Sequence, residues 1–310
     1  MNSGILLVDK PQGITSHDVV ARMRRLAGTR KIGHAGTLDP MATGLLVLGV
    51  NSATRLLHYL VGLDKEYLAT VRLGWATTTD DAEGDALAAA PVDAVAAVTE
   101  AAVRTAMAPL SGEIEQVPSA VSAVKVAGKR AYQRVREGET VELAPRRVTV
   151  SAFELLELRA GDGWLDLDVR VECSSGTYVR ALARDLGVAL GTGGHLTALR
   201  RTRIGRFDVA EASVLEDFDV AASLIRPADA ARRALPVIEV SEQEAVDLGH
   251  GKRVDAGGAP AHGASDADAD SHIGSAFAAI APGDRLVAIV ERRGTQLKVV
   301  TGFPPEEPGE

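Results

Sequence analysis

The sequence predicts an α+β protein that carries a small β-rich domain at its C-terminal end. Strand-like apolar runs alternate with segments of helical periodicity over the first two-thirds of the chain. Near the C-terminus, two runs at 284–292 and 296–302 flank Arg293-Gly294, a turn signal that is typical of a β-hairpin. The length of 310 residues is sufficient for one large domain and one small domain.

The first predicted elements are a strand, a turn and a capped helix. The strand is Gly4–Asp9, and the turn follows at Lys10–Ser16. Thr15 or Ser16 is suited to cap a helix that ends near Leu26, because a hydroxyl oxygen can accept a bond from a free backbone N–H group. We also expect a buried strand at 45–50, a helix at 52–63, strands at 65–74, 147–158 and 164–173, and helices at 93–110, after Thr177 and at 241–249.

A glycine-studded stretch, Lys31–Gly49, lies between the first helix and the following strands. It contains Asp39-Pro40, and a proline holds the residue before it in an extended conformation. A carboxylate is therefore placed on a rigid loop at the mouth of a strand, which is a frequent position for a catalytic acid or nucleophile. The alternative is that Asp39 only accepts hydrogen bonds from the turn backbone, as Asp before proline commonly does.

Residues 33–46 read Gly-His-Ala-Gly-Thr-Leu-Asp-Pro-Met-Ala-Thr-Gly-Leu-Leu. This run resembles the catalytic loop of the bacterial tRNA pseudouridine-55 synthases, the TruB family, at every fixed position. Residues 5–16, 116–138 and 173–187 resemble three further motifs of that family. In the segment 116–138, Ser119 and Val121 stand where the family has proline and tyrosine, so a contact from that tyrosine ring is not expected.

The resemblance spans about residues 4–215 and implies a fold and a domain division. We expect a pseudouridine synthase fold, a mixed and mostly antiparallel sheet that is flanked by helices. The catalytic domain would cover residues 1–215, with an inserted thumb at about 116–147 that clamps an RNA stem-loop. Residues 216–310 would form a PUA-like domain similar to that of actinobacterial members. Its segment 256–279 is rich in Gly, Ala, Ser and Asp, so we expect a flexible loop there.

Three catalytic side chains are implied by the resemblance. Asp39 would act as a nucleophile at C1′ of a uridine or as a base at C2′, and both routes stay open. Arg180 would pair with Asp39 and orient it. Tyr67 would lie under the base, hold the detached uracil and relay the C5 proton. Without the motifs, Tyr67 would be read as a core residue of a strand and Arg180 as part of a surface ion pair.

The resemblance also implies an RNA interface and a substrate pocket. His34 would fill the gap that a flipped-out base leaves, although a lone histidine in a glycine loop more often bonds the backbone. We expect the other RNA-binding residues to be Lys10, Lys31, Lys125, Lys129, Arg130, Arg134, Arg136, Arg200 and Arg201. We expect the pocket to be lined by Gly36, Thr37, Leu38, Tyr178 and Leu199.

The charge distribution is compatible with an RNA partner although the net charge of the chain is −8. Three segments are basic: residues 1–60 carry a net charge of +4, residues 125–147 carry +4 and residues 170–207 carry +5. If these segments converge in space, they form a basic groove on an otherwise acidic protein. The alternative is that the charges are scattered and solvated.

Several classes of protein are disfavoured by composition. Cys173 is the single cysteine, which excludes an internal disulfide and a cysteine-based zinc site. No apolar run approaches the roughly 18–20 residues of a membrane span, and the early acid Asp9 argues against a signal peptide. We therefore expect a cytoplasmic protein. The resemblance further implies that the partner is the T-arm stem-loop of tRNA, and we expect a monomer that uses no metal and no cofactor.

The acidic stretch Asp80–Asp85 carries four carboxylates but lacks the spacing of an EF-hand, so we expect a solvated loop.

Two other functions stay open. One is a non-catalytic RNA-binding or RNA-folding protein on the same fold, and the other is an aspartate-dependent hydrolase. A steep loss of affinity with added salt would reveal an RNA partner, because phosphate contacts release counterions.

Overall fold

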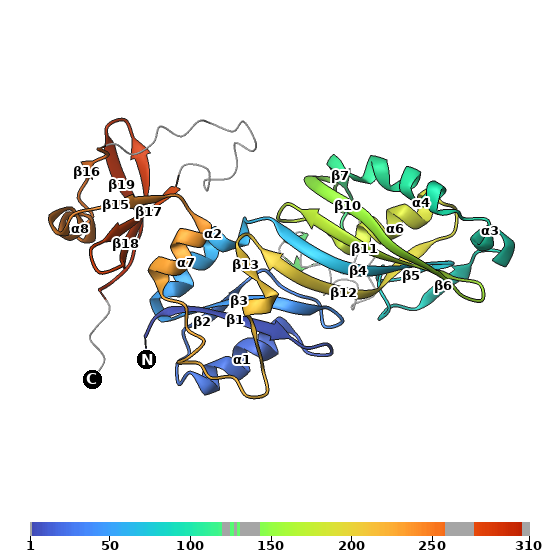
Figure 1. The fold of residues 1–310 in the computed structure, drawn as a ribbon, viewed down its shortest axis with the longest axis horizontal. Helices are drawn as coiled ribbons and strands as arrows, with labels where there is room; N and C mark the ends of the chain where they lie inside the picture. The colour runs from blue at the N-terminus through green and yellow to red at the C-terminus, as the bar shows by residue number, and fades with distance from the viewer. Residues whose placement is uncertain (1, 120–124, 127–128, 131–142, 258–275, 306–310) are drawn as a thin grey trace. The chain divides into compact units, whose positions relative to one another are not determined.

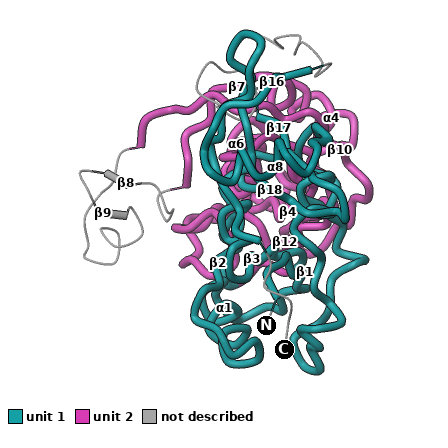
Figure 2. The backbone as a smooth tube through the Cα atoms, turned by 90° about the vertical axis from the view of Figure 1, so that its left-hand side faces the viewer, with its two compact units in different colours: residues 1–40, 44–63, 203–310 teal, residues 41–43, 64–202 magenta. Residues whose placement is uncertain are grey.

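The structure is a computed structural model that describes residues 2–119, 125–126, 129–130, 143–257 and 276–305. Figure 1 labels the helices and strands along the chain. Two compact units are distinguished in Figure 2: unit 1 contains residues 1–40, 44–63 and 203–310, and unit 2 contains residues 41–43 and 64–202. Each unit is described below by itself.

Unit 1 begins with the strand, turn and helix that the sequence predicts. Thr15 caps α1 and forms a capping box with Asp18, because the Thr15 side chain accepts from the Asp18 backbone while the Asp18 carboxylate accepts from the Thr15 backbone. The N-terminal elements are β1 (Gly4–Lys10), α1 (Ser16–Leu26), β2 (Ile32–Ala35), β3 (Thr43–Val50), a 3-10 helix η1 (Asn51–Leu56) and α2 (Leu57–Val61).

β1 and β3 form the centre of the N-terminal part of unit 1. They pair antiparallel from Gly4 opposite Val50 to Lys10 opposite Gly44, and β2 pairs antiparallel with the other edge of β3. Both faces of the β1–β3 pair are buried: one packs against α1, and the other packs in a cluster that includes side chains of α2 and α7. This double burial explains the nearly continuous apolar sequence of the predicted strand at 45–50.

The C-terminal part of unit 1 is β-rich, as predicted. Its sheet has the strand order β15-β17-β18-β19-β16. The elements after residue 204 are β13 (Phe207–Asp208), a 3-10 helix η3 (Val209–Glu211), β14 (Ser213–Val214), α7 (Pro227–Ala234), β15 (Val237–Glu239), α8 (Glu242–Gly249), β16 (Val254–Asp255), β17 (Ala276–Ala281), β18 (Arg285–Arg293) and β19 (Gln296–Gly302).

The expected flexible loop at 256–279 is wrong at its C-terminal end. Residues 276–279 belong to β17, whose six side chains are all buried and which pairs antiparallel with β18. Alanine-rich sequence resembles a linker in composition, but small side chains also suit a strand that is packed on both faces. At the other end of the predicted loop, Ala256 is buried and its N donates to Thr295 O (2.7 Å), and residues 258–275 lie outside the described residues.

Unit 2 contains a sheet in which β4, β11, β10 and β7 pair antiparallel in that order, with β12 beside β4. Its elements are β4 (Lys65–Leu73), β5 (Trp75–Thr77), β6 (Ala86–Ala89), α3 (Val92–Ala96), α4 (Glu100–Met107), a 3-10 helix η2 (Ala108–Leu110), β7 (Gly112–Gln116), β8 (Lys125–Val126), β9 (Lys129–Arg130), β10 (Arg146–Ala160), β11 (Leu165–Cys173), α6 (Val179–Ala189) and β12 (Gly194–Ile204), whose last two residues belong to unit 1.

The predicted fold class is confirmed. Antiparallel pairs dominate, and the parallel pair of β1 with β14 makes the strand pairing mixed. The predicted helix at 93–110 is divided, because Thr99 caps a new helix by accepting a hydrogen bond from Ala102 N. The predicted helix at 52–63 consists of a 3-10 turn followed by the short α2.

Candidate active site

In unit 1, the loop that carries Asp39 is held on both sides of that residue. Before it, the buried Ser16 hydroxyl accepts a hydrogen bond from Leu38 N (2.9 Å) and donates one to Leu38 O (3.1 Å). After it, Pro40 O accepts from Gly13 N (2.8 Å) and from the Lys10 ammonium (3.4 Å). Asp39 itself is half-buried. The N-terminal turn therefore fixes the backbone that presents this carboxylate.

Lys10 is placed differently from the RNA contact that the sequence predicts. Its side chain is fully buried, and its Nζ also donates to Pro11 O (2.9 Å) and Ile14 O (2.8 Å). These carbonyls and that of Pro40 surround the ammonium. This burial favours a role in organising the turn and the Asp39 loop over direct contact with a phosphate.

The other predicted site residues of unit 1 lie on the Asp39 loop, on β2 or directly before β2. His34 is half-buried on β2, and its ring makes an edge contact with that of His17, with centroids 5.6 Å apart. Gly36 begins the loop with φ of 90°, a conformation that glycine adopts without strain. Thr37 and Lys31 are exposed, and Leu38 is buried. Gly36, Thr37 and Leu38 thus directly precede Asp39, whereas Lys31 lies at the other end of β2, where its carbonyl accepts from Asn51 N (2.8 Å).

In unit 2, Tyr67 lies on the buried face of β4. Side chains alternate along this strand, so that Lys65, Tyr67 and Ala69 point inward. Burial lowers the pKa of Lys65 to about 8, and the positive charge of nearby Arg201 is the second cause. Cys173 lies directly opposite Lys65 on β11, and burial raises the pKa of its thiol to about 11. Cys173 is therefore a neutral buried thiol.

The acidic turn after β5, here defined as residues 78–84, binds the predicted catalytic arginine. Asp81 Oδ2 lies 3.2 Å from Arg180 Nη1, and both side chains are about 5% exposed or less. Arg180 Nη1 also donates to Thr79 O (3.0 Å). The other oxygen of Asp81, Oδ1, accepts from Thr79 Oγ1 (2.5 Å) and Glu83 N (3.1 Å). Arg180 is therefore held by a carboxylate that is itself oriented by two donors.

The expectation of a solvated acidic loop is wrong for its first two carboxylates. Asp80 and Asp81 are both buried, whereas Glu83 and Asp85 follow the expected pattern more closely. Burial is possible because Arg180 and Arg184 neutralise the two carboxylates. These arginines lie about 100 residues further along the chain, so a local pattern of acids could not reveal them. Asp81 is a functional candidate that sequence reasoning missed.

The start of α6, where Tyr178 and Arg180 lie, is fastened to the end of β7. Gln116 is buried, and its side-chain amide donates from Nε2 to Tyr178 O (3.0 Å) and accepts at Oε1 from Tyr178 N (2.8 Å). Tyr178 is the N-cap residue of α6 and makes no side-chain cap bond of its own. The Tyr178 carbonyl also accepts from Ala181 N (3.0 Å), so Gln116 adds a donor to that carbonyl and provides an acceptor for the Tyr178 N–H at this helix end.

The remaining predicted site residues are distributed over unit 2. Leu199 and Arg201 are buried on β12, and Arg200 between them is half-buried. The burial of Arg201 beside Lys65 argues against a direct phosphate contact in this conformation. Lys125 lies on β8 and Lys129 and Arg130 on β9, a two-stranded pair. Arg134 and Arg136 lie outside the described residues.

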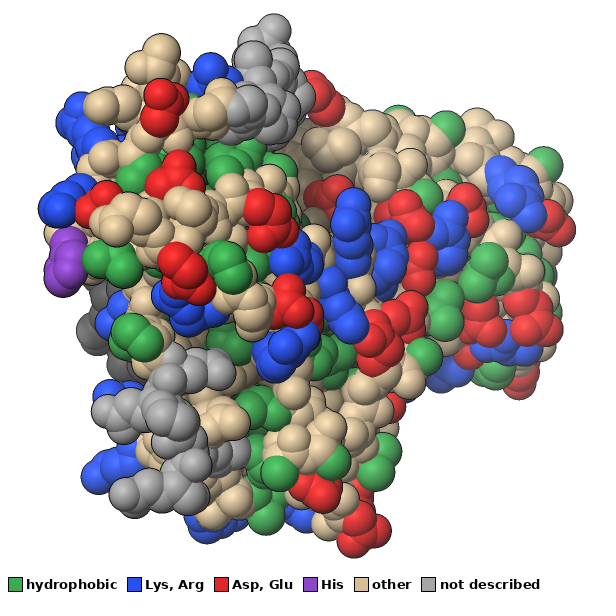
Figure 3. Space-filling model, turned by 60° about the vertical axis from the view of Figure 1, so that its left-hand side comes forward, with side chains coloured by type: hydrophobic (Ala, Val, Ile, Leu, Met, Phe, Trp, Pro, Cys, Tyr) green, Lys and Arg blue, Asp and Glu red, His purple; other side chains and the backbone are tan. Residues whose placement is uncertain are grey.

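The convergence of the basic segments stays a prediction. On the face drawn in Figure 3, Lys and Arg side chains are interspersed with Asp and Glu side chains.

Among the described residues, no group of three or more His, Cys, Asp or Glu side chains is arranged to hold a metal ion. A search of the same residues for helices that are long and apolar enough to span a membrane found none.

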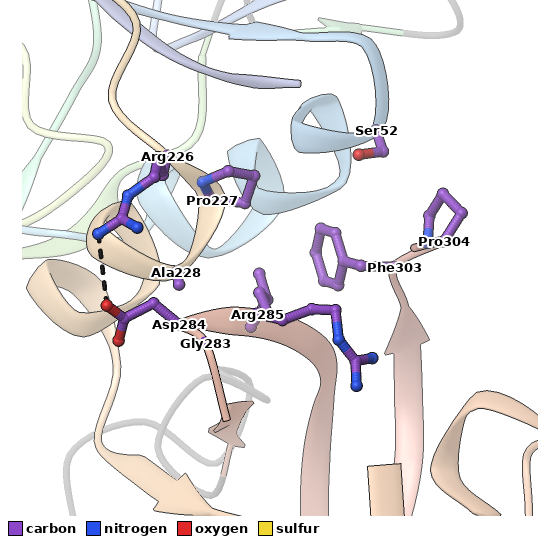
Figure 4. A pocket seen from close by; sticks show the side chains of 10 residues that line it. Ser52, Arg226, Pro227, Ala228, Gly283, Asp284, Arg285, Phe303 and Pro304 are labelled. Atoms are coloured by element: carbon purple, nitrogen blue, oxygen red, sulfur yellow. Dashed lines mark hydrogen bonds and ion pairs between the residues drawn. The ribbon is translucent and has the colours of Figure 1, made fainter. Parts of the chain in front are cut away.

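A separate pocket of about 200 Å³ lies in unit 1 and contains none of the predicted site residues (Figure 4). Arg226 and Arg285 lie at this pocket, but Arg226 pairs with Asp229 and Asp284, and Arg285 pairs with Glu242. Its lining residues are Ser52, Arg226, Pro227, Ala228, Gly283, Asp284, Arg285, Leu286, Phe303 and Pro304. Since the cations already have carboxylate partners, this pocket offers little attraction for a phosphate.

Comparison with known proteins decides the family. A family model described as "TruB family pseudouridylate synthase (N terminal domain)" matches residues 24–179, and one described as "tRNA pseudouridylate synthase B C-terminal domain" matches residues 180–238. The chain belongs to the TruB family of pseudouridine synthases. The predicted family is thereby confirmed, and with it the expectation of a tRNA-modifying isomerase.

Curated relatives with the same family name match this TruB-family chain over its full length. It is 57% identical to a tRNA pseudouridine synthase B of Leifsonia xyli, over 99% of this chain and 98% of that protein. It is 55% identical to the tRNA pseudouridine synthase B of an Arthrobacter species, with both chains covered completely. In the solved structures, a chain of a Cbf5-Nop10-Gar1 complex shares 26% identity and a TM-score of 0.71, over 97% of this chain and 85% of that chain.

Proposed function

We propose that this tRNA pseudouridine synthase isomerises the uridine at position 55, in the T loop of tRNA, with Asp39 as the essential carboxylate. The observation that carries this proposal is the double anchoring of the Asp39 loop, by Ser16 at Leu38 and by Gly13 and Lys10 at Pro40. A carboxylate held at both neighbouring residues loses little conformational freedom when it meets a sugar carbon. Such preorganisation is a large source of rate enhancement.

The reaction rearranges bonds within one nucleotide. The C1′–N1 bond breaks, the uracil turns, a C1′–C5 bond forms, the proton on C5 leaves, and N1 gains a proton. Atoms and electrons balance without an oxidant, a reductant or an energy source. Asp39 is the nucleophile at C1′ or the base at C2′, as carboxylates act at other sugar centres. The target must leave its stack first, because stacked bases shield the reacting atoms.

The other side chains receive supporting roles in this proposal. Arg180 orients the Asp39 carboxylate, and Asp81 holds the Arg180 guanidinium at 3.2 Å. Tyr67 contacts the detached uracil and relays the C5 proton. His34 occupies the gap left by the flipped base. Thr37, Leu38, Tyr178 and Leu199 line the pocket, and the exposed Lys31 contacts phosphate.

The partner is the T-arm stem-loop, bound by one copy of the chain in the cytoplasm. The domain division at residue 215 belongs to the same proposal: residues 1–215 carry the chemistry, and the β-rich part from residue 216 is an RNA-binding PUA-like domain. Family membership and the tRNA in the relatives' names support this assignment.

The test is pseudouridine formation on an unmodified T-arm stem-loop, with wild type beside Asp39→Asn and no added metal or cofactor. Product from wild type and none from Asp39→Asn, with stem-loop affinity retained, is the expected result. Normal product formation by Asp39→Asn would refute the role of Asp39. If neither protein made product while both bound the RNA in a salt-sensitive way, an RNA-binding function would replace the enzymatic one at this substrate.

A further inference from the structure

Two arginines on α6 reach the same acidic turn. Arg180 and Arg184 are four residues apart and therefore lie on one face of the helix, one turn from each other. Each binds one of two consecutive aspartates: Arg180 Nη1 lies 3.2 Å from Asp81 Oδ2, and Arg184 Nη1 lies 3.3 Å from Asp80 Oδ2. The two ion pairs therefore lie one helical turn apart along α6 and join it to consecutive residues of the acidic turn.

The backbone of Asp80 is arranged for this second pair. Its φ is 61°, in the left-handed region that few residues other than glycine, asparagine and aspartate adopt. Its carbonyl accepts from Leu196 N (3.0 Å), which ties the turn to β12. A non-glycine residue persists in this conformation when the surrounding contacts determine it. The Asp80 side chain is 12% exposed, so its charge is largely removed from water.

Arg184 has two further contacts. Its Nε donates to Asp185 Oδ1 (2.9 Å), the next residue of α6, and its Nη2 donates to Val117 O (2.8 Å), directly after β7. The neighbouring Gln116 makes two hydrogen bonds to the backbone of Tyr178, at the beginning of the same helix. The first half of α6 is therefore attached to the acidic turn at two points and to the end of β7 at two points.

We propose that Arg184 is a positioning residue for the isomerisation, which acts by fixing α6 against the acidic turn so that Arg180 keeps its place. One ion pair would let the helix rotate about Arg180 or slide by a fraction of a turn. A second pair one turn away resists both motions. The inference rests on the proposed function, because it assumes that Arg180 orients Asp39. A misplacement of about 1 Å in a catalytic group can cost roughly 100-fold in rate.

The experiment measures stem-loop affinity and the single-turnover rate of pseudouridine formation at saturating enzyme. The variants are Arg184→Gln, Asp80→Asn and the double variant. Asparagine suits position 80 because it also tolerates a positive φ, so the change removes charge without adding backbone strain. Arg104→Gln is the matched control, since Arg104 on α4 pairs with Glu100 at i,i+4 and donates to a backbone carbonyl, but its side chain is 55% exposed.

We expect each single variant to lower the single-turnover rate by roughly 10- to 100-fold while affinity changes by less than about twofold. The double variant should be no slower than the slower single variant, because the two residues act as one pair. The Arg104→Gln control should match wild type in both quantities. This split between rate and affinity is not expected from a residue that only binds RNA or only supports folding.

Three results would overturn the inference while the proposed function stands. The first is a wild-type rate in both Arg184→Gln and Asp80→Asn. The second is a loss of RNA affinity in Arg184→Gln without a loss of rate. The third is a loss of rate that is fully explained by a smaller folded fraction of the variant, as measured by thermal unfolding. If wild-type enzyme itself makes no pseudouridine in this assay, the proposed function fails first, and the positioning role falls with it.

Discussion

Charged side chains lie in two contrasting regions of unit 2. In the acidic turn, Asp81 and Arg180 form a pair in which both partners are almost fully buried. On the sheet formed by β4, β11 and β10, Arg170 bridges Glu66, Glu154 and Glu172, whose side chains are 22%, 51% and 31% exposed. The two regions use the same chemical groups at similar N–O distances, yet they differ in their access to water.

This difference in burial determines what each region contributes. Water screens an exposed ion pair and solvates its partners when the pair is broken, so such pairs are worth about 0–1 kcal/mol. A buried pair whose partner is removed leaves an uncompensated charge, which costs about 3–5 kcal/mol. We infer that the acidic turn determines the geometry near Arg180, whereas the exposed network of Arg170 mainly covers a sheet face.

The largest expected effect is at the buried pair. Asp81→Asn keeps the hydrogen-bonding shape of the side chain but removes its charge beside Arg180. We expect the free energy of unfolding to fall by about 3 kcal/mol and the rate of pseudouridine formation to fall by about 100-fold. Chemical denaturation and single-turnover kinetics measure the two quantities. Unchanged values in both would show that burial of this pair has no energetic consequence.

A smaller effect, on the pH dependence of the free energy of unfolding, is expected from Lys65, whose side chain faces the interior from β4. Its pKa is about 8 in the folded protein and about 10.5 as a free group, so between these pH values the unfolded state binds more protons. The free energy of unfolding therefore gains a contribution that rises with pH from about 8 to about 10.5, by up to about 3 kcal/mol. Lys65→Met removes this rise.

The measurement is the free energy of unfolding of wild type minus that of Lys65→Met, taken at several pH values. The difference should be flat below pH 8 and increase above it. Cys173 contributes with the opposite sign, because burial raises the pKa of its thiol, and its charge is coupled to that of Lys65 directly opposite. The substitution Cys173→Ala is therefore made in both proteins, so that only Lys65 differs between them. Parallel curves across the whole range would contradict a buried ammonium at Lys65.

The smallest effect is expected at the exposed network. Arg170→Gln leaves Glu66, Glu154 and Glu172 near one another, but all three remain accessible to water. We expect the free energy of unfolding to fall by about 1 kcal/mol or less and the rate of pseudouridine formation to match wild type. A loss as large as that of Asp81→Asn would show that exposure does not separate the two regions.

Several features of the protein follow from its sequence alone. The contiguous run from Gly33 to Leu46 identified the family, and the family models confirm it. Local patterns also predicted α1 with a cap at Thr15 or Ser16, of which Thr15 is the observed cap, and the two C-terminal strands near 284–292 and 296–302. These features are encoded by neighbouring residues, because capping, turn chemistry and hydrophobic periodicity depend on side chains only a few positions apart.

Other features were decided by the tertiary structure. Asp80 and Asp81 belong to an acidic stretch that is typical of a solvated loop, and they are buried because α6 brings Arg184 and Arg180 to them. Lys10 was predicted to contact RNA, yet its buried ammonium donates to three backbone carbonyls. Sequence sets which groups are charged, but packing sets which of them lose water. That loss depends on partners distant in the chain, which no local pattern contains.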